Sequence, residues 1–198
     1  MIGRVREFDI DDATQVAMDL FWSQGYELTS LNDLISATHL SKSSFYQAFG
    51  SKRELFTRCL SLYESGLVDN MTALLADSSS GLDFINKILL SVADETRGLK
   101  SRRGCLLMNT ASEFAQSDAD ISKRVRHGKQ QMLKVFVKAV HQAQLEKHIS
   151  KKDEPEVIAD YLLACVSGLK TMVKSGDSAQ TIVKVSEVIM SNLSVEKR

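Results

Sequence analysis

Apolar residues recur at spacings of three and four along almost the whole chain, which is the pattern of amphipathic helices. The first stripe starts after Asp9 and ends at Gly25, and a second starts after Ser30, which can form a capping pair with Asp33. Later stripes predict helices at residues 51–76, 82–97, 104–115, 119–147, 154–175 and 178–193. Apolar and polar residues never alternate over more than a few positions, so we expect an all-α fold.

A short polar helix is predicted at residues 41–49, where Ser41 can cap its start. Phe45 and Phe49 fall on one face and are expected to enter the core, because so short a helix needs support from its neighbours. The outward positions can all form hydrogen bonds and none is acidic: Ser41, Lys42, Ser43, Ser44, Tyr46 and Gln47. Such a face fits the major groove of DNA, and the preceding helix with a tight turn at His39 completes a helix-turn-helix.

The same segment resembles the N-terminal signature of the tetracycline-repressor (TetR) family. The resemblance rests on the order and spacing of Thr29, Asp33, Leu40-Ser41-Lys42, Phe45-Tyr46, Phe49 and Ser51-Lys52-x-x-Leu55. It covers residues 8–60, and beyond them the similarity is only architectural. His39 departs from the family pattern, which usually has glycine there, and must adopt a left-handed or bridging conformation.

This resemblance implies two domains. A three-helix DNA-binding domain is expected at residues 1–52, and a helical domain for ligand sensing and dimerisation at residues 53–198. It also implies a homodimer in which the helices at 154–175 and 178–193 pair with the same two helices of a second subunit. Two-fold symmetry would set the reading helices ~34–36 Å apart on a near-palindromic operator. Alternatively, both stripes merely close the C-terminal core.

Individual roles at the DNA follow from these positions. The best candidates for contacts to base edges or phosphates are Ser41, Lys42, Ser43, Ser44 and Gln47. Tyr46 is expected on a phosphate or a thymine methyl group, and Lys52, by the family resemblance, on a backbone phosphate. Thr29 and Ser30 lie at a helix N-terminus whose free amides can hold a phosphate. Arg4 and Arg6 form a basic arm that either reaches the adjacent groove or frays.

Charge tests this interpretation, because the formal net charge of the chain is zero. Residues 1–60 carry six Lys and Arg against eight Asp and Glu. Phosphate contact needs only a local positive face, and residues 38–58 carry four cations against Glu54. These cations are Lys42, Lys52, Arg53 and Arg58. A solvated mixture of charges is the alternative.

Composition argues against several other classes of protein. Apolar residues make up 43% of the chain, which is too many for a disordered protein. No run of about 18 apolar residues and no signal-peptide stretch occurs, so we expect no membrane span. Three widely spaced cysteines do not suggest disulfides, which favours the cytoplasm. We find no phosphate loop, nucleophile–base pattern or close metal-ligand spacing, and expect no enzymatic activity, no cofactor and no metal.

The C-terminal half carries candidate sensor residues. Those that could line a ligand pocket are Phe84, Ile88, Leu89, Val92, Met108, Phe114, Met132, Phe136 and Tyr161. Apolar residues at helical spacing can equally form plain core, so the pattern names no ligand.

Cys105 is the sharper sensor candidate. Four cations precede it: Arg97, Lys100, Arg102 and Arg103. Nearby cations and a helix N-terminus favour the reactive thiolate form of a cysteine. The stretch Gly104-Cys105-Leu106 is similar to that of a branch of TetR-like regulators that includes electrophile- and oxidant-sensing members. Burial as a small apolar residue is the alternative, and it is the role expected for Cys59 and Cys165.

The leading hypothesis is a dimeric, TetR-like regulator of transcription. It would act as a repressor that a small-molecule effector, or modification of a thiol, releases from a palindromic DNA operator. The alternative is an architectural DNA-binding protein without an effector site. A cavity among the C-terminal helices would favour the regulator.

Overall fold

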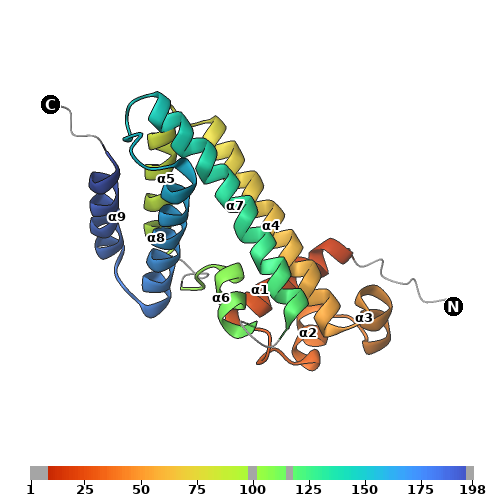
Figure 1. Cartoon of the computed structure of the whole chain (residues 1–198). Coiled ribbons are helices and arrows are strands. Elements are labelled where there is room, and N and C mark those ends of the chain that lie inside the picture. The colour runs from red at the N-terminus through yellow and green to blue at the C-terminus, as the bar shows by residue number, and fades with distance from the viewer. Residues whose placement is uncertain (1–8, 98–101, 115–117, 195–198) are drawn as a thin grey trace.

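A computed structural model describes residues 9–97, 102–114 and 118–194, and over these ranges the chain forms nine helices (Figure 1). They are α1 (Ile10–Gln24), α2 (Leu31–Thr38), α3 (Lys42–Phe49), α4 (Lys52–Ala76), α5 (Gly81–Asp94), α6 (Leu106–Phe114), α7 (Ala119–Leu145), α8 (Pro155–Ser175) and α9 (Ala179–Leu193). One isolated antiparallel bridge joins Ile149 to Ser194. The expected all-α fold is therefore confirmed.

The helices begin where capping side chains predict them to begin. The Asp9 carboxylate accepts a hydrogen bond from the Asp11 amide at 2.7 Å. Ser30 and Asp33 form the reciprocal capping box, in which each side chain accepts from the other residue's amide. Helix ends were harder to predict: α5 and α7 both end earlier than expected, and α7 is followed by a turn at Lys147 with φ 63°.

The N-terminal helices surround an aromatic core. Phe21 of α1 packs edge-on against Phe56 of α4, with ring centroids 4.9 Å apart. Phe45 of α3 is fully buried, as expected. The turn between α2 and α3 passes through His39, whose φ of 56° and ψ of 24° are left-handed. Histidine thus adopts the left-handed conformation that was expected at this turn, where the family pattern usually has glycine.

Two long helices connect this core to the remainder of the protein. Helices α4 and α7 run side by side and in parallel (Figure 1), because the Ser61 hydroxyl accepts from Arg124 at 2.5 Å and Glu64 pairs with His127 one turn further along. At their far ends α7 packs against α5 and α8, and α9 packs against α5 and runs antiparallel to α8. None of the helices described is long and apolar enough to cross a membrane.

The start of α5 lies unusually close to α7. A Cβ atom at Gly81 would lie 2.1 Å from the carbonyl oxygen of Ala139 and 2.7 Å from the amide nitrogen of Ala143. The Gly81 amide also donates to the Glu146 carboxylate at 3.1 Å. Glycine is therefore required where α5 meets the backbone of α7.

Replacing Gly81 with alanine should destabilise the protein by roughly 1–3 kcal/mol, because the added methyl group forces two backbones apart. Gly66→Ala is the matched control, since a Cβ there meets nothing within 4 Å. That change should stabilise α4 by about 0.5–1 kcal/mol. Urea unfolding of both variants measures the difference, and equal stabilities would contradict the close approach.

Candidate DNA-binding surface and effector cavity

The outward face of α3 is polar and open to solvent. Lys42, Ser43, Tyr46 and Gln47 are exposed, and Ser44 is half-buried. Helix α3 lies at the end of the molecule opposite α9 (Figure 1), so no other described helix covers this face. The arrangement offers hydroxyl, amide and ammonium groups along one short helix.

A serine cluster starts this helix. The exposed Ser41 hydroxyl accepts from the Ser44 amide at 3.1 Å and lies 2.9 Å from the Ser43 hydroxyl and 2.8 Å from the Ser44 hydroxyl. The cap therefore fixes the first turn of α3 while its oxygen atoms remain near the surface. The structure thus brings the predicted residues 41–47 together on one helix.

The two residues predicted to contact DNA at the N-terminus of α2 differ in exposure. Thr29 is fully buried; its hydroxyl donates to the Gly25 carbonyl at 2.6 Å and its amide to the Tyr26 carbonyl at 3.3 Å. The Ser30 amide donates to Asp33 at 2.8 Å. Phosphate binding by the free amides at the start of α2 stays a prediction, while the Thr29 side chain ties the turn to the end of α1. Ser30 itself is exposed.

The predicted positive face is narrower than expected. Arg53 forms a two-pronged ion pair with Asp118 at 2.9–3.0 Å, and Arg58 pairs with Asp11 at 3.0 Å. The Ile121 amide and the Arg53 guanidinium hold the pKa of Asp118 below its usual range, so this carboxylate stays charged.

Lys42 and Lys52 are the cations that remain for an anionic partner. Within the described ranges no ion pair involves either of them, although Lys52 lies over the Tyr26 ring at 4.1 Å. Arg4 and Arg6, the expected basic arm, lie outside the described residues.

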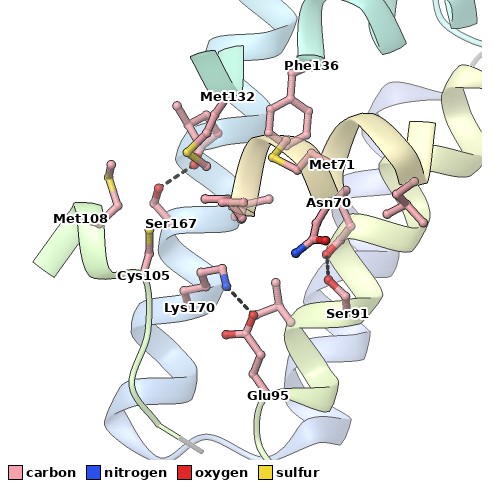
Figure 2. Close-up of a pocket in the computed structure, with 16 residues that line it drawn as sticks. Asn70, Met71, Ser91, Glu95, Cys105, Met108, Met132, Phe136, Ser167 and Lys170 are labelled. Carbon is pink, nitrogen blue, oxygen red and sulfur yellow. Dashed lines mark hydrogen bonds and ion pairs between the residues drawn. The ribbon is translucent and has the colours of Figure 1, made fainter. Parts of the chain in front are cut away.

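A cavity of about 210 Å³ lies among the helices of the C-terminal half (Figure 2). Its lining comes from α4 to α8: Leu67, Asn70, Met71, Leu74, Ile88, Ser91, Val92, Glu95, Cys105, Met108, Met132, Phe136, Leu163, Val166, Ser167 and Lys170. Five residues predicted from the sequence are among them: Ile88, Val92, Met108, Met132 and Phe136.

Four other residues predicted for the pocket do not line this cavity. Phe84 and Leu89 are fully buried elsewhere in the core. Phe114 packs instead on Tyr26, with ring centroids 5.2 Å apart, and Tyr161 is 40% exposed on α8. Helical spacing shows which residues face inward but not which of them border an empty space.

Sequence reasoning missed the polar side of the cavity. Lys170 of α8 donates to the Glu95 carboxylate at the end of α5 and forms an ion pair with it (Figure 2). Asn70 and Ser91 are exposed lining residues and mark the mouth. Glu95 follows the last residue of α5 and Lys170 lies within α8, far apart in sequence, so only the packing reveals the pair.

Cys105 lies directly before α6 and lines the cavity, with 4% of its surface exposed. The Tyr63 hydroxyl donates to its Sγ at 3.5 Å, and burial raises the pKa of Tyr63 well above its usual value, which keeps this donor protonated. The expected cationic surroundings are only partly present, because Arg103 pairs with Asp19 at 2.8 Å. Lys100 lies outside the described residues.

The other two cysteines differ from each other. Cys59 is fully buried, and burial raises its pKa to about 12, which fits the core role expected for it. Cys165 is only half-buried, and it packs against the edge of the core rather than inside it. Across the residues that the structure describes, no group of three or more His, Cys, Asp or Glu side chains could hold a metal ion.

Helix α6 borders the cavity and also forms hydrogen bonds with the N-terminal part of the protein. The Glu113 carboxylate accepts from the amides of Tyr26 at 3.1 Å and Glu27 at 2.7 Å, in the segment between α1 and α2. At its other end, the Trp22 indole donates to the Gly104 carbonyl at 3.2 Å. The helix that follows Cys105 is therefore bonded at both ends to the unit that carries α3.

Comparison with known proteins adds family relationships to this geometry. Residues 14–59 match the family described as "Bacterial regulatory proteins, tetR family", and residues 81–189 match "Tetracyclin repressor-like, C-terminal domain". The chain is 24% identical over 185 residues to the HTH-type transcriptional repressor ComR of Escherichia coli, covering 93% of this chain and 88% of ComR. It is 26% identical over 162 residues to the HTH-type regulator YezE of Bacillus subtilis, covering 81% and 84%.

Solved structures share the fold. A cysteine mutant of the TetR family transcriptional regulator CifR, complexed with 26-bp double-strand operator DNA, superposes with a TM-score of 0.85 at 24% identity. The match covers 96% of this chain and 100% of that one. The reduced form of NemR from E. coli gives a TM-score of 0.84 at 18% identity, covering 94% and 96%.

Proposed function

Because the chain belongs to the TetR family of bacterial regulatory proteins, we propose that it is a DNA-binding regulator of transcription, a repressor that a small effector releases from its operator. The outward face of α3 carries this proposal: it is polar, exposed and free of acidic residues, while Phe45 and Phe49 anchor the helix from behind. The relative ComR is named a repressor, and the related CifR was solved with operator DNA.

The roles at the DNA divide between base reading and phosphate binding. Gln47 presents an amide that can pair with an adenine edge, and the serines at 41, 43 and 44 offer shorter hydroxyl contacts. Tyr46 reaches a phosphate or a thymine methyl group. Lys42 and Lys52 supply the positive charge, and exposed Ser30 offers a further hydroxyl at the start of α2. Thr29 positions Ser30 rather than contacting DNA.

A homodimer would form through α8 and α9. Both helices expose apolar side chains: Val157 at 61%, Tyr161 at 40% and Val188 at 59%. A Cβ at Gly168 would meet nothing within 4 Å, so nothing in the chain itself requires glycine there. Glycine inside a helix is destabilising, and a second α8 that approaches closely would explain it. This pairing would place two α3 helices on one face of the DNA.

An effector in the cavity can act on α3 through α6. Cys105 and Met108 line the cavity, and five residues further on Glu113 holds the segment between α1 and α2. A shift of α6 on binding would therefore move the helix-turn-helix of each subunit and change the spacing of the reading helices. The division of the chain at residues 52 and 53 stays a prediction, since α4 begins at that point and continues unbroken.

Cys105 offers a second trigger, because a reagent that enters the cavity meets its thiol. A regulator of chromosomal genes would act in the cytoplasm, where its three free cysteines would stay reduced. The alternative function, an architectural DNA-binding protein, needs no effector site, and the cavity with its ion pair favours the regulator. No reaction is proposed for the protein.

The proposed roles of Gln47 and Lys52 predict different effects on DNA binding when each residue is replaced. Gln47→Ala should relax base preference at particular operator positions, at a cost of about 1–3 kcal/mol at the preferred base. Lys52→Ala should weaken binding to all duplexes alike and lower the salt slope by about one. Fluorescence anisotropy on matched operator and scrambled duplexes separates the two effects, with Lys138→Ala at an exposed position of α7 as the control. Equal losses on both duplexes for Gln47→Ala would count against its role.

The dimer prediction rests on Val188. Val188→Glu should raise the dimer dissociation constant roughly 100-fold, because a carboxylate would be buried between apolar faces. Leu62→Glu on α4, 40% exposed, is the control that should leave the dimer intact. Sedimentation equilibrium measures both variants. An unchanged dimer in Val188→Glu would place the interface elsewhere.

If modification of Cys105 releases the operator, replacing this residue should abolish release by thiol reagents but not DNA binding. Cys105→Ser should keep operator binding but abolish release by peroxide or a small electrophile such as N-ethylmaleimide. Cys165→Ser, at a more exposed position, should respond like the parent protein. Operator release, followed by anisotropy, is the measurement. If Cys105→Ser responds normally, the thiol is not a trigger.

A further inference from the structure

The cavity has two chemically different ends. Met71, Met132 and Phe136 line one end (Figure 2), and these side chains are apolar and polarisable. The opposite end carries the ion pair between Glu95 and Lys170. A ligand that fills the space therefore meets an apolar surface on one side and two opposite charges on the other.

The two charged side chains differ in their exposure to solvent. The Lys170 side chain is only 15% exposed, and it comes from the middle of α8, among the residues that line the cavity. The Glu95 side chain is 36% exposed and caps the end of α5, where the negative end of the helix dipole disfavours a carboxylate. Glu95 can therefore turn towards water at small cost, whereas Lys170 cannot.

This difference in exposure determines which charge a ligand in the cavity should carry. A cationic ligand paired with Glu95 would leave the Lys170 ammonium enclosed without a partner, which is strongly unfavourable. An anionic ligand paired with Lys170 would release Glu95 to solvent, and one ion pair would replace another. An uncharged ligand would leave the pair intact and gain only the apolar contacts.

We propose that the cavity binds a small monocarboxylate with a compact apolar body, whose carboxylate takes the place of Glu95 on Lys170. The inference rests on the proposed function, since it names the class of effector for the same site. The volume of about 210 Å³ lies below the range of about 300–1,000 Å³ usual for drug-sized ligands, so the body must be small. Three methionine thioethers, of Met71, Met108 and Met132, favour a flat aromatic ring and also adapt to a short alkyl chain.

Calorimetric titration of the full chain without DNA tests the ligand class with matched probes. Benzoate should bind about tenfold or more tightly than benzamide, because its carboxylate keeps Lys170 paired while Glu95 leaves the negative end of the α5 dipole for water. Hexanoate and hexanamide form a second pair with an alkyl body, and benzylamine is the cation. A preference for the carboxylate in either pair supports the proposal. No preference in both pairs, no binding by any probe, or tightest binding of benzylamine overturns it.

Three variants identify the anchor. Lys170→Met keeps the side-chain stem and should reduce carboxylate binding to the level of the amide. Glu95→Gln removes the competing charge and should tighten carboxylate binding several-fold, an increase that damage to the fold would not produce. Lys174→Met, one turn further along α8 at an exposed position, should change neither affinity. Unchanged carboxylate preference in Lys170→Met would contradict the proposal.

The outcome is separable from that of the proposed function. Carboxylate binding that leaves operator binding unchanged would keep this ligand class but remove its regulatory role. A protein that releases its operator for another ligand, yet shows no carboxylate preference, would keep the regulator and refute the ligand class.

Discussion

An eight-residue helix cannot hold its shape in water, and the N-terminal part of this protein is arranged around that constraint. Helix α3 is stable because Phe45 and Phe49 are buried and because Ser41 satisfies the amide of Ser44. The apolar side chains of α3 therefore pack into the core, and its polar side chains on the opposite face remain available to solvent or DNA. The exposed surface that supports a DNA-binding function is therefore a consequence of how the helix is held.

The same elements that hold α3 also reach the cavity. Helix α4 starts three residues after α3 ends and contributes Asn70 and Met71 to the cavity lining. Helix α6 borders the cavity through Met108 and bonds through Glu113 to the segment before α2. A ligand that changes the packing of α4 or α6 would thus change the position of α3 without touching it, which is the coupling that a ligand-responsive regulator requires.

Local rules made much of the fold predictable from the sequence. Two helix starts were evident from the sequence: that of α2 from the capping box of Ser30 and Asp33, and that of α4 from the apolar positions that follow Ser51. The polar face of α3 was evident from the spacing of its residues. Properties that depend on tertiary packing were not predictable. Burial of Thr29, neutralisation of Arg53 by Asp118, and the meeting of Glu95 with Lys170 all join segments whose contact no local pattern encodes. The roles of the individual DNA-contacting residues stay predictions.

The central claim is that two copies of α3, related by two-fold symmetry, read DNA in adjacent turns of the major groove. The most direct measurement is selection of bound sequences from a pool of random duplexes by the full-length protein. The account predicts enrichment of a near-palindrome whose half-sites lie about 10 base pairs, or a multiple of one helical turn, apart. Recovery of sequences without enrichment, or of a single asymmetric site, would contradict it.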